Sequence, residues 1–238
     1  MCSSDLSIIG ELAGRHLKKC VLELGGADPF VLLSTDDLPG AVDDALSART
    51  GNVGQACNGA KRFVVVDELY DAFVGLLNDK IATAGNAAPL SSVGAAEELA
   101  GQVAAAVDAG ANLVSAGERD GAFHPVGVLT DVTPDNPAYH QEFFGPVAMV
   151  FRAADEADAI RIANDTPYGL GSYVYTTDPE QADRVASALE VGMVFVNGVG
   201  LEAVELPFGG VRLSGYGREL GTLGIDEFVN KKMIRVAR

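Results

Sequence analysis

Two side chains suited to covalent catalysis, Cys57 and Glu23, lie beside glycines at the ends of apolar runs in this 238-residue chain, and a second carboxylate, Glu142, completes the set. Cys57 lies in GQACNGAKR (54–62), Glu23 in VLELGG (21–26) and Glu142 in EFFGPV (142–147). A thiol nucleophile with an attendant carboxylate base can form and then break a covalent intermediate. A single cysteine is more often a small core hydrophobe, so the residues around Cys57 must decide between the two interpretations.

The segment around Cys57 is typical of a turn that leaves backbone N–H groups free. Glycines flank the cysteine on both sides, and the next strand is expected to begin at about Arg62. Free N–H groups lower the pKa of a thiol and can bind an oxyanion, and Lys61 adds positive charge nearby. Cys20, in contrast, starts an apolar strand and is expected to be inert.

Glu23 has two possible interpretations. Leu22 and Leu24 flank it in a strand that reads as buried, where desolvation would raise the pKa of the carboxyl towards the range of a general base. Alternatively, the strand alternates and the face that carries Glu23 meets water. The pattern alone leaves both open.

Composition excludes several classes of protein. No apolar run approaches the roughly 20 residues that span a bilayer, so no membrane segment is expected. A net charge of −16 opposes binding to nucleic acid. Three cysteines without a CxxC pair, and three histidines without metal-ligand spacing, predict neither a disulfide scaffold nor a metal site. Reduced thiols and the lack of an export signal favour the cytoplasm.

Apolar β-rich runs alternate with helical patterns, which predicts an α/β fold with a sheet covered on both faces. Strands are expected at 20–24, 29–33, 62–66, 148–152, 172–177 and 192–197. Helices are expected at 36–49, 69–77, 95–109 and 178–189, and loops at 82–94 and 201–224.

The segment GVGLEA (198–203) matches the GxGxxA fingerprint of dinucleotide-binding folds and follows a predicted strand. That fingerprint needs a helix directly after it, whose N-terminus faces the pyrophosphate. Pro207, Gly209 and Gly210 disfavour such a helix, so we predict no dinucleotide site here.

Several separate motifs, in one order, strongly resemble those of the aldehyde dehydrogenase superfamily. They are LELGG (22–26), GQAC (54–57), EFFGPV (142–147), NDTPYGL (164–170) and PFGGVRLSGYGRE (207–219). The likeness runs from about residue 11 to the end. It implies an aldehyde dehydrogenase-like catalytic domain with a mostly parallel sheet covered by helices.

The resemblance implies a role for each candidate residue. Cys57 would attack an aldehyde carbonyl, its own backbone N–H would bind the oxyanion, and Glu23 would activate the water that hydrolyses the thioester. NAD or NADP would take the hydride, with Glu142 on the nicotinamide ribose, Phe144 near the ring and Gly25 beside the cofactor. No metal is implied.

The resemblance also implies a domain organisation. Residues 1–25 would be a remnant of a dinucleotide-binding domain, most of which the sequence does not contain, and residues 1–6 read as foreign to the family. Residues 26–227 would form the catalytic domain. Residues 228–238 resemble the strand that family members place in their oligomerisation interface, so we expect a homo-oligomer in a full-length parent.

The segments GADPF (26–30) and AKRF (60–63) most resemble the succinate-semialdehyde dehydrogenase branch. The resemblance also implies that Phe208 forms a wall of the substrate pocket. Some members of that branch bind the substrate carboxylate through an Arg and a Ser, where this chain has Gly51 and Glu202–Ala203. A negative Glu202 disfavours a carboxylate substrate unless it points away. Two alternatives stay open: a cofactor-free thiol esterase and an inert assembly module.

Overall fold

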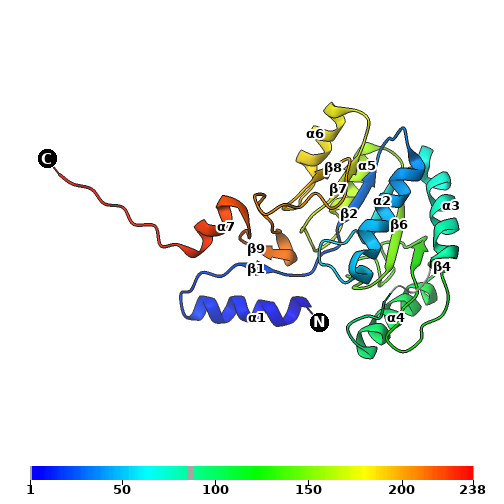
Figure 1. The fold of residues 1–238 in the computed structure, drawn as a ribbon, viewed down its shortest axis with the longest axis horizontal. Helices are drawn as coiled ribbons and strands as arrows, with labels where there is room; N and C mark the ends of the chain where they lie inside the picture. Colours follow the sequence, from blue (N-terminus) through cyan, green and yellow to red (C-terminus); the bar gives the residue numbers. More distant parts are fainter. Residues whose placement is uncertain (1, 85–87, 238) are drawn as a thin grey trace.

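Short apolar segments and the helices between them build the fold of Figure 1, a computed structural model that describes residues 2–84 and 88–237. The helices are α1 (Cys2–Arg15), α2 (Leu38–Thr50), α3 (Asp67–Thr83), α4 (Val93–Asp108), α5 (Glu156–Asn164), α6 (Pro179–Ala188) and α7 (Gly221–Phe228). The strands are β1 (Leu22–Glu23), β2 (Pro29–Leu32), β3 (Arg62–Val66), β4 (Asn112–Ser115), β5 (Gly127–Thr130), β6 (Val147–Ala153), β7 (Tyr173–Tyr175), β8 (Phe195–Val196) and β9 (Gly215–Tyr216).

Seven strands form one sheet in the order β4-β5-β6-β3-β2-β7-β8. All neighbours are parallel except β4 and β5, which run antiparallel at one edge. The central strand β3 is buried along its whole length because β2 and β6 flank it and helices cover it on both faces. A parallel sheet with continuous apolar strands needs this double cover.

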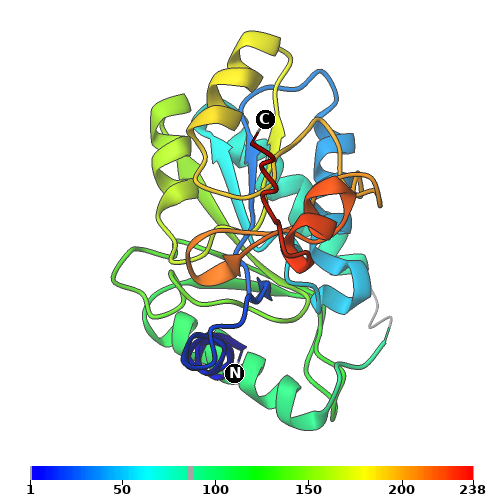
Figure 2. The ribbon, with the colours of Figure 1, turned by 90° about the vertical axis from the view of Figure 1, so that its left-hand side faces the viewer.

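Two apolar clusters, one on each face, hold the helices against the sheet. Helices α2 and α3 pack on the face that carries Phe30, Phe63 and Tyr175. Helices α4, α5 and α6 pack on the face that carries Val31, Val64 and their neighbours in the strands. Figure 2 shows the two layers of helix on either side of the strands. The predicted α/β fold with a mostly parallel sheet is confirmed.

The ends of the chain lie outside this sheet. Strand β1 pairs antiparallel with β9 in a separate two-stranded ribbon, so the strand predicted at 20–24 is real but does not join the main sheet. The segment 229–237 leaves the body as an extended tail beyond α7 (Figure 1). Within the described residues it pairs with no strand, and its role in oligomerisation stays a prediction.

Each predicted strand and helix overlaps an observed one, and the structure adds β4, β5, β9, α1, α5 and α7. The predicted loop at 201–224 is wrong in part, since it contains a 3₁₀ turn, β9 and the start of α7. The loop predicted at 82–94 is shorter in the structure, because α3 ends at Thr83 and α4 begins at Val93. Residues 85–87 of this loop lie outside the described part. No helix in the described chain has both the length and the apolar character to cross a bilayer.

Candidate active site

The amino-terminal edge of the parallel sheet brings the predicted site residues together. Gly26 precedes β2, Cys57 precedes β3 and Glu142 precedes β6, and these three strands are neighbours in the sheet. The Gly26 N–H donates to Glu142 Oε1 at 3.0 Å. A Cβ on Gly26 would lie 2.4 Å from the carbonyl oxygen of Cys57, so only glycine fits between the two loops.

Cys57 lies in a turn that follows a sharp reversal of the chain. Asn52 and Val53 both take left-handed backbone angles, with φ of 50° and 57°, which is rare for a β-branched residue such as valine. The thiol is half-buried, and this burial raises the pKa of Cys57 above its ordinary value. Asp28 and Glu23 raise it further through their negative charge, while Lys61 and the N–H of Asn58 oppose them. The predicted lowering of this thiol pKa is therefore wrong, because desolvation outweighs the nearby cation.

The carboxylate of Glu23 is buried, which agrees with the first of the two interpretations of this residue. Both carboxylate oxygens are shielded from solvent, and within the described chain neither has a hydrogen-bond partner. Burial raises the pKa of Glu23 to about 7, Glu219 adds to the rise and Arg218 opposes it. The side chain lies against Gly209, where a Cβ would be 2.7 Å from Oε1. A carboxyl group with a pKa near neutrality suits a general base.

The candidate cofactor residues lie side by side on the same edge. A Cβ on Gly25 would be 2.2 Å from Glu142 Oε2, so the missing side chain of this glycine leaves a cradle beside the carboxylate. The side chain of Glu142 is 11% exposed, and its Oε1 lies 3.5 Å from Lys61 Nζ. The Phe144 ring, two residues on, is 43% exposed despite its apolar character. A carboxylate and an open aromatic face are groups that can hold a ribose and pack against a nicotinamide ring.

Phe208 lines an apolar cavity of about 200 Å³ together with Met193, Phe195 and Leu220. Glu202 also lines it, and Asn58 Nδ2 donates to Glu202 Oε1 at 2.7 Å. Asn58 is the neighbour of Cys57 in the chain, so Glu202 does not point away from the candidate site. At this position the negative charge of Glu202 would repel a carboxylate substrate.

A buried polar cluster lies behind the Cys57 turn, and the sequence predicted only the positive charge of Lys61 from it. Asp28, Arg49 and Lys61 are all fully buried, and burial lowers the pKa of Lys61 to about 8 and raises that of Asp28 to about 7. Arg49 offered a sequence signal, since it falls on the apolar face of the helix predicted at 36–49. In the part of the chain that the structure describes, no cluster of acidic, histidine and cysteine side chains is arranged to hold a metal ion.

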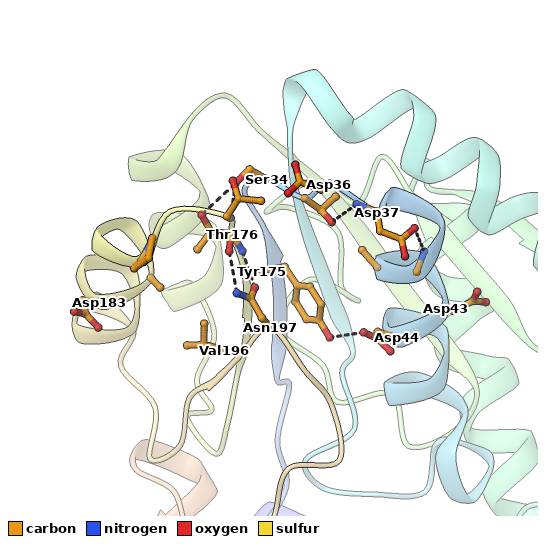
Figure 3. Close-up of a pocket in the computed structure, with 16 residues that line it drawn as sticks. Ser34, Asp36, Asp37, Asp43, Asp44, Tyr175, Thr176, Asp183, Val196 and Asn197 are labelled. Carbon is orange, nitrogen blue, oxygen red and sulfur yellow. Dashed lines mark hydrogen bonds between the residues drawn. The ribbon is translucent and has the colours of Figure 1, made fainter.

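A second cavity, of about 810 Å³, lies at the opposite edge of the sheet, beyond the carboxyl ends of β2, β7 and β8 (Figure 3). Its lining includes Asp36, Asp37, Asp43, Asp44 and Asp183. Two of these carboxylates already accept hydrogen bonds from the chain itself, Asp37 from the Gly40 N–H and Asp44 from the Tyr175 hydroxyl. The negative lining opposes an anionic dinucleotide, and none of the predicted site residues lies here.

Known proteins include relatives that match almost the whole of this chain. The chain is 50% identical to the succinate-semialdehyde dehydrogenase [NADP(+)] of Deinococcus radiodurans and 44% identical to that of Mycolicibacterium paratuberculosis, over 95% of its own length. It covers 50% of each, so the chain spans about half the length of the curated relatives it matches.

Solved structures give the same fold. The succinic semialdehyde dehydrogenase of Streptococcus pyogenes, solved with NADP⁺, matches 99% of this chain with a TM-score of 0.93 and 39% identity, and the chain covers 55% of it. Lactaldehyde dehydrogenase from Escherichia coli matches 98% with a TM-score of 0.91 and 31% identity, and the chain covers 51% of it. The model of the aldehyde dehydrogenase family matches residues 6–234, and the chain belongs to this family.

Proposed function

We propose that residues 26–227 form the catalytic domain of an NAD(P)-dependent aldehyde dehydrogenase. Cys57 in this domain is the nucleophile, and Glu23, in the segment before it, is the base. The observation that carries the proposal is the packing of the Cys57 turn against the segment that leads on from Glu23, where a Cβ on Gly26 would lie 2.4 Å from the Cys57 carbonyl oxygen. Burial raises the pKa of the Cys57 thiol, with a small contribution from the charge of Glu23, and burial brings the pKa of Glu23 itself to about 7. A nucleophile and a base in one partly desolvated site are what two-step acyl chemistry needs.

The reaction begins when the Cys57 thiolate adds to the aldehyde carbon and forms a thiohemiacetal. The carbonyl oxygen becomes an oxyanion, which the backbone N–H of Cys57 would stabilise. NAD(P), when bound, would supply the acceptor for the hydride that leaves the thiohemiacetal carbon, so that a thioester remains on Cys57. Glu23 then takes a proton from water, the hydroxide attacks the thioester, the carboxylic acid leaves and the Cys57 thiolate is regenerated.

The residues present fit a nicotinamide cofactor. Glu142 would bind the ribose hydroxyls through Oε2, which faces the cradle at Gly25, while Oε1 stays bound to the Gly26 N–H. Phe144 would offer its exposed ring to the nicotinamide. Relatives named as NADP⁺-dependent support NADP as the first cofactor to test.

Succinate semialdehyde is the first substrate to test, since the two curated relatives named above carry its name. Glu202 argues against an anionic aldehyde unless a further residue of the whole protein binds the carboxylate. Phe208 and its apolar neighbours would accept the chain of a neutral aldehyde equally well.

The deciding experiment joins this chain behind the amino-terminal half of the Deinococcus radiodurans relative. NADPH absorbance is followed with succinate semialdehyde and with butanal, after circular dichroism and gel filtration have shown that the chimaera folds. We expect turnover that Cys57→Ala abolishes and Cys20→Ala leaves unchanged. A folded chimaera without turnover, or with turnover that survives Cys57→Ala, contradicts the proposal.

The thiol esterase alternative needs only residues of this chain, because thioester hydrolysis by Cys57 and Glu23 involves no cofactor. Steady turnover of 4-nitrophenyl acetate by the chain alone, lost in Cys57→Ala, would support it. The absence of both esterase and dehydrogenase activity, with Cys57 unreactive, would instead favour an inert assembly module.

A further inference from the structure

The turn that carries Cys57 is bound from behind through its carbonyl groups. Every carbonyl from residue 54 to residue 59 accepts a hydrogen bond from a side chain. The donors are Arg49 to Gly54, Asn52 to Gln55, Lys61 to Ala56, Cys57 and Gly59, and the hydroxyl of Tyr173 to Asn58.

Lys61 makes three of these bonds with one ammonium group. Its Nζ lies 2.9 Å from the carbonyl oxygen of Ala56, 2.8 Å from that of Cys57 and 3.2 Å from that of Gly59. The side chain is fully buried, so water cannot replace these contacts. A buried ammonium is costly unless it is paired and hydrogen-bonded, and here all three of its N–H bonds have acceptors.

These bonds fix the direction of two N–H groups. In a trans peptide the C=O and N–H point in opposite directions, and the carbonyl of Ala56 shares its peptide plane with the N–H of Cys57. The carbonyl of Cys57 likewise shares its plane with the N–H of Asn58. Lys61 holds both carbonyls inward, so both N–H groups turn away from the buried cluster. Within the described chain no backbone carbonyl accepts from either of them, and the Asn58 N–H is directed at the Cys57 thiol.

We propose that Lys61 is a positioning residue, which binds the carbonyls of Ala56 and Cys57 and thereby aims the N–H groups of Cys57 and Asn58 at the reacting centre. The inference rests on the proposed nucleophilic role of Cys57. It adds the element that builds the oxyanion site: the Cys57 N–H receives the oxyanion, and the Asn58 N–H stabilises the thiolate.

The charge of Lys61 acts on the same centre. Burial opposes the thiolate, and Lys61 counters it across the Cys57 carbonyl. Lys61 faces Arg49, Glu142, Asp28 and Cys57, so its charge is shared within a cluster of two cations and two carboxylates. Loss of Lys61 should therefore weaken both the oxyanion site and the thiolate.

Two reagents separate these effects in the chain alone. Iodoacetamide alkylates a thiolate without forming an oxyanion, so its rate against pH reports the thiolate alone. Acylation by 4-nitrophenyl acetate passes through a tetrahedral oxyanion and reports both. The ratio of acylation to alkylation at Cys57, followed on its peptide by mass spectrometry, therefore isolates the oxyanion donors.

Three variants and a control give distinct expectations. Lys61→Met loses the charge and the donors, so alkylation at pH 7 should fall about tenfold and the ratio should fall a further ~10²-fold. Lys61→Gln loses the charge but keeps donors, so alkylation should fall while the ratio is largely retained. Gly26→Ala keeps Lys61 but pushes on the Cys57 carbonyl, so the ratio should fall with little change in alkylation. Lys80→Met, on the surface of α3, should change neither.

An unchanged ratio in folded Lys61→Met, or in Gly26→Ala if the lysine variants do not fold, overturns the proposal. So does a wild-type thiol that iodoacetamide alkylates but 4-nitrophenyl acetate does not acylate. Neither reagent needs a nicotinamide cofactor. The chimaera can therefore lack dehydrogenase activity while the Lys61 variants still change the ratio of acylation to alkylation. Conversely, the chimaera can be active while the ratio stays unchanged, so the two proposals fail separately.

Discussion

Glu23 is a carboxyl group that the fold keeps at a cost in stability, and Glu23→Gln should reveal that cost. In the folded chain the pKa of Glu23 rises from its usual 4.5 to about 7, chiefly through burial. The folded state therefore binds the proton more tightly than the unfolded state. The free energy of unfolding should fall as pH rises between these two values, and the full cost should apply above pH 7.

The size of this cost follows from the shift. One pKa unit corresponds to about 1.4 kcal/mol, which sets an upper bound of about 3 kcal/mol for Glu23. Its surroundings are only about half-buried, so solvent screening reduces the expected effect to about 1–2 kcal/mol. Glutamine keeps the shape of the side chain and cannot ionise. The variant should therefore be more stable than wild type at pH 8 by that amount, with a much smaller difference at pH 5.

Urea unfolding followed by circular dichroism at pH 5 and pH 8 measures both differences. The exposed Glu205→Gln serves as a matched control for the loss of one carboxylate at the surface. With 4-nitrophenyl acetate, Glu23→Gln should still acylate Cys57 in a burst but fail to turn over. A stability difference that does not grow with pH would refute the buried, proton-binding Glu23, and unchanged steady turnover would refute its role as base.

Three further predictions concern charge, packing and cofactor. In the chimaera, Glu202→Gln should raise kcat/KM for succinate semialdehyde about tenfold and leave butanal unchanged, because it removes a like charge from the apolar cavity. Arg62→Met should lower the free energy of unfolding by about 3 kcal/mol in urea, since it removes two charge-assisted hydrogen bonds and leaves the carbonyl of Tyr139 without a donor, whereas Lys80→Met should have little effect. In the chimaera, Gly25→Ala should displace Glu142 and raise the Kd for NADP⁺ at least ~tenfold, which a fluorescence titration measures. The rate of Cys57 alkylation should stay unchanged. Unaltered NADP⁺ binding would contradict the placement of Gly25 and Glu142 in the cofactor site.

The parallel core was predictable because its strands are continuous apolar runs between helical patterns. Strand β3 matches its predicted bounds, and every residue in it is buried. The edge strand β4 was not found from the sequence, since its residues are mostly exposed and it is defined by antiparallel pairing with β5. Helix α5 was also missed, although the sequence carries a signal for it. Asp155 caps the helix by accepting from the Asp158 N–H, and Ala159 and Ile162 face the core.

The sequence carries motifs for a candidate site but little about its electrostatics. The motifs around Cys57 and Glu23 predict which residues act, and these roles stay a prediction. The sign of the thiol pKa shift depends on how deeply the turn is buried and on Asp28, and neither is visible in the spacing of residues. Lys61 was visible only as a nearby positive charge, because nothing in its neighbours shows that it points inward.

The same burial acts in opposite directions on the two groups proposed to react. It helps Glu23, whose raised pKa makes it a better base near neutrality, and it hinders Cys57, whose thiolate it disfavours. A site that desolvates both must therefore restore the thiolate by local means. Lys61 is suited to this because a buried cation that binds carbonyls adds charge and aims N–H groups without opening the site to water. The lysine thus offsets the desolvation of the thiolate. Because Lys61 and Glu23 act on the thiolate separately, the fold-loss in acylation rate from Lys61→Met should be the same in a Glu23→Gln background, and a much smaller loss there would show that the two residues are coupled.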